Sequence, residues 1–220
     1  MRQLLTQNVA TSLYWLGRYI ERVEATLIEI DKAYDKIIDV DKNAGVALYK
    51  KFDIDLEYVD AMDFLNKSIR GDHSANLATI MYYARENTMI SRSNIDVAAF
   101  GEIIELEGLF KTMSNSPLPI DYKDMDHALS LINVIWGAQA KRGHRRCSDY
   151  FLKLGKLTEE VDFRLRFDKG PDVTNIILSD INILLDILGP DLNLKMLTYD
   201  EEDDIMASLN EKIAKLIVVE

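Results

Sequence analysis

Residues 9–27 read VATSLYWLGRYIERVEATL, and this stretch decides the fold. Its apolar and aromatic side chains recur at alternating steps of four and three residues, and the pattern runs through Val9, Leu13, Leu16, Ile20, Val23, Leu27, Ile30, Tyr34 and Ile37. A period of about 3.5 residues is typical of one continuous helix, predicted here to run from about Gln3 to Val40. Because packing of the apolar stripe supplies most of the stability of such a helix, it needs neighbours along its length. We therefore expect an all-α protein.

A related stretch follows later in the chain, where residues 147–165 read CSDYFLKLGKLTEEVDFRL. Each stretch has a Leu-Gly pair, with carboxylates four and seven residues after the glycine. These residues are Gly17, Glu21 and Glu24 in the first stretch and Gly155, Glu159 and Asp162 in the second. The similarity predicts two related long helices, which form an internal pseudo-repeat.

The remaining segments also carry helical patterns, and all four prolines lie between them, where proline does not interrupt a helix. Further helices are expected over about 55–68, 74–95, 96–112, 121–141, 172–188 and 205–217. Asp121 is expected to cap the helix that follows it, and Ser148 or Asp149 to cap the repeat helix. Short connections favour antiparallel neighbours, so the sequence predicts one all-helical domain over residues 1–220, arranged as an up-and-down helical bundle.

Composition narrows the class of protein. The 220-residue chain has a formal net charge of −11, which disfavours generic nucleic-acid binding because phosphate backbones are negative. Its single cysteine, Cys147, cannot form an internal disulfide and suits a reducing compartment. With no signal-peptide pattern and no run of about 18 apolar residues, we expect a cytoplasmic protein outside the membrane. No P-loop, GxGxxG or CxxC motif occurs, so no cofactor is expected.

Three segments resemble motifs of the bacterial alpha-E domain family, in the order in which the family has them. They are LYWLGRYIERVEAT at residues 13–26, ARENTMISR at residues 84–92 and YFLKLGKLTEEVDFR at residues 150–164. The resemblance spans residues 8–168, whereas residues 171–220 carry no recognised motif.

The resemblance implies an all-helical fold without an assigned reaction. Family members typically occur beside ATP-grasp proteins of the carboxylate–amine ligase type and beside transglutaminase-like proteins, which implies a role in peptide or amide-bond chemistry. The leading hypothesis is a helical accessory or binding protein that acts with such partners, which would supply any ATP chemistry. Two alternatives stay open. The chain could be an enzyme that uses its own carboxylates, or a structural oligomerisation module whose helical seam pairs across a dimer.

Gly17 predicts that another segment approaches the first helix closely, because glycine costs about 1 kcal/mol inside a helix relative to alanine. The helix that contains Gly155 is the natural candidate. The four motif carboxylates would then meet, with Arg18, Arg22, Arg85, Arg92 and Lys156 as countercharges. The candidate functional surface comprises Tyr14, Trp15, Gly17, Arg18, Glu21, Arg22, Glu24, Arg85, Glu86, Asn87, Arg92, Lys156, Glu159 and Asp162.

This surface admits three interpretations. The carboxylates can form a satisfied ion-pair network, line a polar pocket for a ligand or partner tail, or hold a metal. Ferritin-like bundles bind iron through Glu-x-x-His, and neither motif contains histidine, so no metal is assigned. An enzyme site would show a cavity and a carboxylate with a raised pKa and no arginine partner. A scaffold would show every carboxylate paired and no cavity.

One basic cluster stands out in the acidic chain and comprises Lys141, Arg142, His144, Arg145 and Arg146. Positive charge suits the C-terminal end of the preceding helix. The same side chains could bind a phosphate group, a carboxylate-rich tail or an acidic partner. Residues 200–204, DEEDD, suit the N-terminal turn of the last helix.

Overall fold

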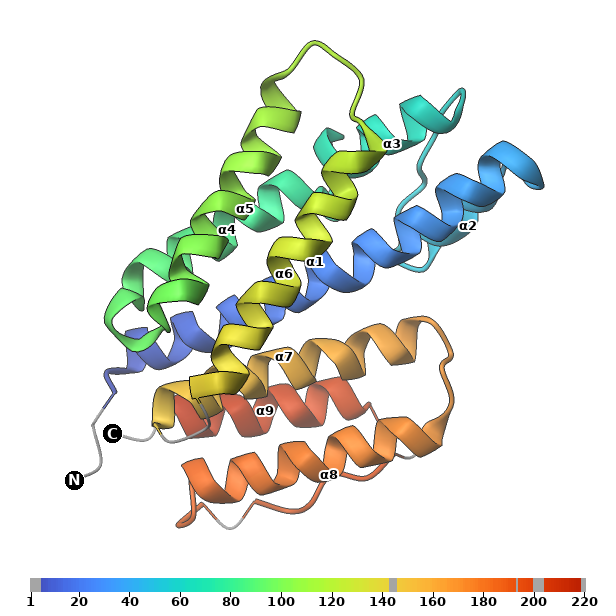
Figure 1. Cartoon of the computed structure of the whole chain (residues 1–220). Helices are drawn as coiled ribbons and strands as arrows, with labels where there is room; N and C mark the ends of the chain where they lie inside the picture. The colour runs from blue at the N-terminus through green and yellow to red at the C-terminus, as the bar shows by residue number, and fades with distance from the viewer. Residues whose placement is uncertain (1–4, 143–145, 193, 200–203, 219–220) are drawn as a thin grey trace.

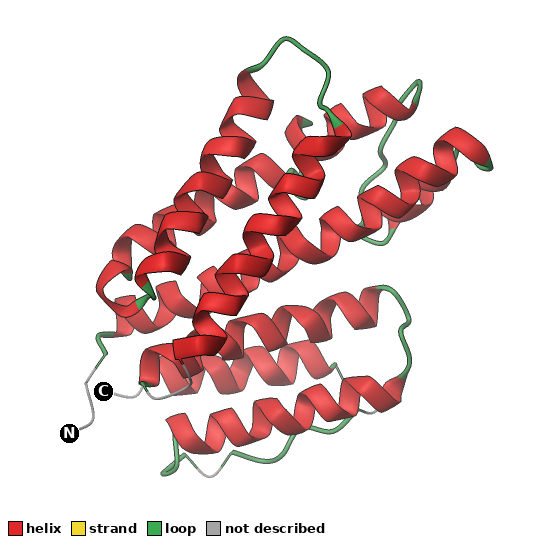
Figure 2. Ribbon diagram, viewed as in Figure 1, coloured by secondary structure: helices red, strands yellow, loops and turns green. Residues whose placement is uncertain are grey.

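The computed structural model describes residues 5–142, 146–192, 194–199 and 204–218. Every regular element in these ranges is helical, which confirms the all-α prediction (Figures 1 and 2). The elements are α1 (Gln7–Asp39), α2 (Ala44–Lys50), α3 (Ala61–Arg70), α4 (Leu77–Ile90), the 3₁₀ helix η1 (Arg92–Asn94), α5 (Val97–Asn115), α6 (Tyr122–Arg142), α7 (Cys147–Arg166), α8 (Pro171–Leu188) and α9 (Ile205–Val218).

α1 is the central element, because it packs against α2, α3, α4, α6, α7 and α9. Its predicted seam forms the middle of the core, and Leu13, Leu16, Val23 and Ile30 are inaccessible to solvent. Burying one such side chain contributes roughly 2 kcal/mol to stability. Since the chain's own helices cover this seam, it is not free to pair with a second copy, as the oligomerisation alternative requires.

The helices form two groups on either side of α1 (Figure 1). α4, α5 and α6 lie on one side, and α7, α8 and α9 lie on the other. α4, α5 and α6 reverse direction from one helix to the next, as do α7 and α8, in the manner of an up-and-down bundle, whereas α9 runs in the same direction as α8 because the segment between them returns along α8. α1 and α7 instead run in the same direction, since their contacts proceed from Gly17 and Gly155 to an ion pair between Glu29 and Lys169. Short loops do not set the relative direction of helices this far apart in the chain.

Local capping explains where two helices begin. Asp121 accepts a hydrogen bond from the backbone N–H of Lys123 at 3.0 Å, which confirms its predicted capping role in α6. α7 starts at Cys147, and the carboxylate of Asp149 accepts from the backbone N–H of Arg146 at 3.1 Å. Asp149 therefore caps from inside the first turn of α7 rather than from the position before it.

The segment after α1 differs from the prediction. α2 was not predicted from the sequence, and it is held by tertiary packing, because Tyr49 is fully buried and contacts Phe64 edge-to-face at 6.1 Å. The helix predicted over 55–68 begins only at Ala61. Asp60 accepts from the backbone N–H of Asp63 at 2.8 Å and fixes that start.

α1 and α7 cross with their backbones in contact at Gly17 and Gly155. A Cβ atom added to Gly17 would overlap the carbonyl oxygen of Leu152, and one added to Gly155 would overlap the carbonyl oxygen of Tyr14. This contact confirms the prediction that the Gly155 helix packs on Gly17. The internal repeat itself stays a prediction from the sequence.

Across the part of the chain that is described, we find no helix with both the length and the apolar character that a membrane span requires.

The crossing predicts opposite effects for two glycine substitutions. Gly17→Ala should lower the free energy of unfolding by about 2 kcal/mol or more, because the backbone of α7 blocks the new methyl group. Gly108→Ala is the matched control on α5, where nothing lies within 4 Å of the added Cβ. This substitution should raise the free energy of unfolding by about 0.5–1 kcal/mol, since alanine is the better helix former. Urea denaturation of both variants measures this, and a stable Gly17→Ala protein would refute the crossing.

Candidate functional site

Two reciprocal ion pairs lock the crossing of α1 and α7. Arg18 donates from Nε to Oε2 of Glu159 at 2.7 Å, and Lys156 donates from Nζ to Oε2 of Glu21 at 2.5 Å. In each pair a cation one residue after a glycine meets a carboxylate four residues after the other glycine. The two helices therefore hold each other through equivalent positions on either side of the glycine contact.

The flank that contains Glu159 is a saturated ion-pair network. Glu159 is 2% exposed and accepts from Arg18, and also from Arg22 at 2.5 and 2.9 Å. Asp162 accepts from Arg18 at 3.4 Å and from Arg166 at 3.0 Å. A buried carboxylate needs such partners, because an unpaired charge in the interior is costly. This flank matches the ion-pair interpretation of the sequence.

On the opposite flank, carboxylates outnumber the cations that face them. Burial raises the pKa of Glu21 to about 7, although Lys156 lowers it, while the neighbouring carboxylates Glu24 and Glu160 raise it further. Lys156 also lies over the ring of Trp136, 4.1 Å from its centroid, and the indole Nε1 of Trp136 donates to Glu24 at 2.8 Å. One lysine thus serves two carboxylates and one aromatic ring.

A cavity of about 330 Å³ opens beside this second flank, between α1 and α7. Glu21, Glu24, Lys156 and Glu160 line its upstream part. A carboxylate with a raised pKa beside a cavity is the signature expected of an acid–base or ligand-binding group. Glu21 pairs with a lysine rather than an arginine, so its environment differs from that of Glu159.

An aromatic ladder, defined here as Trp15, Tyr19, Tyr83 and Tyr82, connects α1 to α4. Trp15 stacks on Tyr19 with centroids 5.5 Å apart, Tyr19 stacks on Tyr83 at 6.0 Å, and Tyr83 meets Tyr82 edge-on at 5.6 Å. Trp15 is 36% exposed, Tyr82 51% and Tyr83 49%. The guanidinium of Arg18 lies over the Trp15 ring, 5.2 Å from its centroid, which ties the ladder to the buried network.

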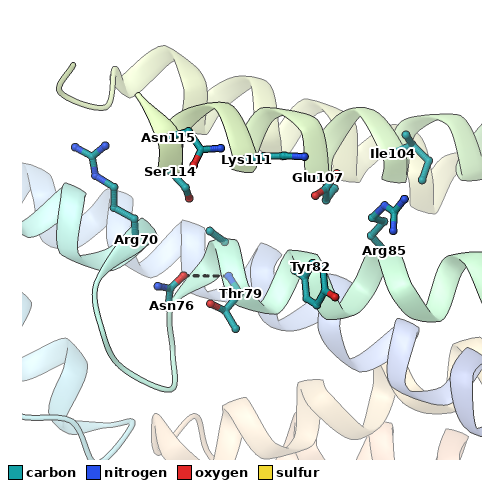
Figure 3. A pocket seen from close by; sticks show the side chains of 11 residues that line it. Arg70, Asn76, Thr79, Tyr82, Arg85, Ile104, Glu107, Lys111, Ser114 and Asn115 are labelled. Carbon is teal, nitrogen blue, oxygen red and sulfur yellow. Dashed lines mark hydrogen bonds between the residues drawn. The ribbon is translucent and has the colours of Figure 1, made fainter. Parts of the chain in front are cut away.

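Tyr82 also borders an open groove of about 810 Å³ between α4 and α5 (Figure 3). Arg70, Arg85 and Lys111 line the groove, together with Glu107 as the only acidic side chain among its lining residues. The groove therefore carries an excess of positive charge in an acidic protein.

Four predicted surface residues do not join the carboxylate network. Arg85 pairs with its neighbour Glu86 at 2.5 Å, and Arg92 lies over the Phe100 ring at 5.2 Å. The side-chain amide of Asn87 donates to the carbonyl oxygen of Tyr83 at 2.8 Å. The countercharge role predicted for Arg85 and Arg92 is therefore wrong, because Arg85 pairs within α4 and Arg92 lies against Phe100 of α5.

Two other residues of the predicted surface are not accessible. Tyr14 and Gly17 are buried at the crossing, so they belong to its packing rather than to an accessible surface.

Of the predicted basic cluster, Lys141 and Arg146 are exposed on either side of the turn between α6 and α7. The Arg142 side chain and all of residues 143–145, with His144 and Arg145, lie outside the described residues. So do residues 200–203, while Asp204 caps α9 by accepting from the backbone N–H of Ala207 at 2.8 Å.

The sequence motifs did not single out four aromatic residues that the structure places near the site, namely Trp136, Tyr19, Tyr82 and Tyr83. Trp15 and Tyr19 are four residues apart and lie off the apolar seam, which was a usable signal for an exposed aromatic stripe. Trp136 belongs to none of the recognised motifs, so only the packing of α6 reveals its contact with Glu24. Among the residues whose placement is described, no group of three or more His, Cys, Asp or Glu is arranged to hold a metal ion.

A family model named Alpha-E, described as a predicted alpha-helical domain with a conserved ER motif, matches residues 5–169. The Glu-Arg dipeptide occurs once in the chain, at Glu21 and Arg22, and its two side chains form ion pairs on opposite flanks of the crossing. No curated protein and no solved structure matches the chain.

Removing the charge of Glu159 should be strongly destabilising. Glu159→Gln leaves two guanidinium groups without their main partner, which is expected to cost about 3 kcal/mol of unfolding free energy. Glu211→Gln is the control, because Glu211 forms an exposed ion pair with Lys215 on α9 and its loss should leave stability near that of the unaltered protein. Thermal and urea unfolding of both variants measures their free energies of unfolding. Equal stabilities would contradict a structural role for Glu159.

Glu21 should make stability depend on pH. Its pKa is raised in the folded state from 4.5 to about 7, so over this range the folded protein retains a proton that the unfolded chain loses. Its contribution to the free energy of unfolding therefore falls as pH rises from 4.5 to about 7, by on the order of 3 kcal/mol. Glu21→Gln should abolish this fall, as measured by urea denaturation of both proteins across the range. A difference between them that is constant with pH would contradict it.

Proposed function

The chain belongs to the Alpha-E family, and on this premise we propose that it is a helical accessory protein that binds a partner through the aromatic ladder. The observation that carries the proposal is the stack from Trp15 through half-buried Tyr19 to Tyr83, whose two ends are exposed. Partly exposed tryptophan and tyrosine side chains are enriched at the centres of protein interfaces. A connected stack of them across two helices supports a docking face more than a solvated surface.

The ladder rests on a rigid base. Arg18 lies under Trp15 and is held by Glu159, so the first ring of the ladder is fixed by the buried network. Side chains that are ordered before binding lose less conformational entropy when a partner arrives. The ion pairs thus support binding without taking part in a reaction.

The adjoining α4–α5 groove favours an acidic partner segment. Arg70, Arg85 and Lys111 outnumber Glu107 among its charged lining residues, and complementary charge steers association and fixes register. The partners implied by the family resemblance are an ATP-grasp-type amide ligase and a transglutaminase-like protein in a bacterial cytoplasm. The absence of a nucleotide-binding motif in the sequence agrees with a partner that supplies ATP chemistry. Peptide or amide-bond chemistry is therefore the proposed context.

A second candidate function is an enzyme that uses Glu21 for acid–base work. The favouring observation is its pKa of about 7 beside a 330 Å³ cavity. Under this alternative, Glu21→Gln abolishes turnover in an amide-ligation assay while partner binding is retained. Under the accessory function, the same substitution alters mainly the pH dependence of stability.

The docking proposal is tested by removing two rings of the ladder. A tagged Trp15→Ala, Tyr83→Ala double variant, crosslinked in its native cells, should lose most of an ATP-grasp or transglutaminase-like partner that the unaltered protein recovers. Truncation of central interface aromatics commonly costs 2 kcal/mol or more, a loss of about thirtyfold in affinity. Quantitative mass spectrometry of the recovered proteins measures the effect.

Tyr122→Ala is the matched control, because Tyr122 is a 37% exposed tyrosine at the start of α6, away from the ladder. Its recovery of partner should equal that of the unaltered protein. If the double variant recovers the same partner in the same amount, the ladder is not the docking face. If neither class of protein is recovered by the unaltered chain, the proposed partners are wrong.

A further inference from the structure

The α1–α7 cavity is charged in opposite senses at its two ends. At the upstream end, Glu21, Glu24 and Glu160 surround the single cation Lys156. At the downstream end, Lys32, Arg164 and Lys169 surround the single carboxylate Glu29. Because α1 and α7 run in parallel, each helix contributes to both ends, and the cavity has an acidic end and a basic end with no excess charge overall.

Ion pairing inside the cavity leaves charge for a ligand at each end. Within the described residues, neither Glu160 nor Arg164 forms an ion pair, and Arg164 instead donates to the hydroxyl of Thr174 and the carbonyl of Lys169. At the basic end Glu29 is shared by two lysines, at 3.0 Å from Lys32 and 3.3 Å from Lys169. Coulombic attraction in a partly buried cavity is stronger than in bulk water.

The spacing of the two ends sets the length of a ligand that can use both. Glu21 and Glu29 are eight residues apart on one helix, a rise of about 12 Å. An extended tripeptide spans about 10 Å, whereas the ammonium and carboxylate of one amino acid lie less than about 4 Å apart. A dicarboxylate would be repelled at the acidic end, and a diamine at the basic end.

The wall between the ends is apolar. Ala25, Ile28 and Phe163 line it, and Lys169 lies over the Phe163 ring at 5.1 Å. Small apolar side chains of a peptide would bury surface there while its two termini remain paired. A cavity of about 330 Å³ is near the lower end of the usual range for small-molecule sites, which suits a short peptide.

We propose that this cavity is a binding site for a short zwitterionic peptide of about three residues. Its ammonium group lies at Glu24 and Glu160, and its carboxylate lies at Lys32, Arg164 and Lys169. The site is separate from the aromatic ladder and does not depend on the docking proposal. An ammonium beside Glu21 also favours the ionised carboxylate, so binding near neutral pH releases a proton.

The test titrates the full chain with trialanine by isothermal calorimetry, alongside N-acetyl-trialanine and trialanine amide. Each analogue removes one terminal charge, and each should bind at least about tenfold more weakly than trialanine. These three titrations use the unaltered protein, so the result is independent of whether any variant folds. No binding of trialanine, or equal binding of all three peptides, overturns the proposal.

Two substitutions then test which terminus of the peptide binds at which end of the cavity. Glu24→Gln should weaken trialanine binding and abolish the preference over the N-acetyl form, while keeping the preference over the amide. Lys169→Gln should do the reverse, and the pair forms a cycle that isolates each contact. Lys215→Gln, at an exposed position of α9, is the matched control and should leave all three affinities unchanged. Loss of the same preference in both variants would overturn the assigned orientation.

Discussion

The backbone contact between Gly17 and Gly155 is the constraint on which the rest of the structure depends. Since neither position has room for a Cβ atom, the two helices meet in one register. In that register, the residue that follows each glycine lies opposite the carboxylate that comes four residues after the other glycine. Both reciprocal ion pairs, from Arg18 to Glu159 and from Lys156 to Glu21, follow from it. Packing and charge pairing therefore specify the same arrangement.

The two flanks of the crossing differ in how their carboxylates are paired. Arginines surround Glu159 and Asp162, which satisfies the buried carboxylates and fixes the helices. On the other flank, one lysine faces several carboxylates beside a cavity, and burial raises the pKa of Glu21, to which the neighbouring carboxylates Glu24 and Glu160 add. The first flank supports the fold, whereas the second retains electrostatic potential that a ligand can use. Different faces of α1 thus carry the aromatic ladder and the proposed peptide site.

Much of the fold was predictable because its signals are local. The heptad-like seam of α1 predicted a long buried helix, and Leu13 through Ile30 are its core. Asp121 predicted the start of α6 through its short-range capping bond. Where tertiary packing competed with local pattern, the prediction failed: α2 has little intrinsic signal and is held by the burial of Tyr49.

The sequence by itself determined the all-helical class, the family, and the meeting of the Gly17 and Gly155 helices, since glycine spacing and apolar period are properties of a single segment. Only the tertiary structure decided the parallel direction of α1 and α7, the lysine partner of Glu21, and the exclusion of Arg85 and Arg92 from the network. The physical reason is that a side chain's partner depends on helix direction and register, which residues far apart in the chain establish together.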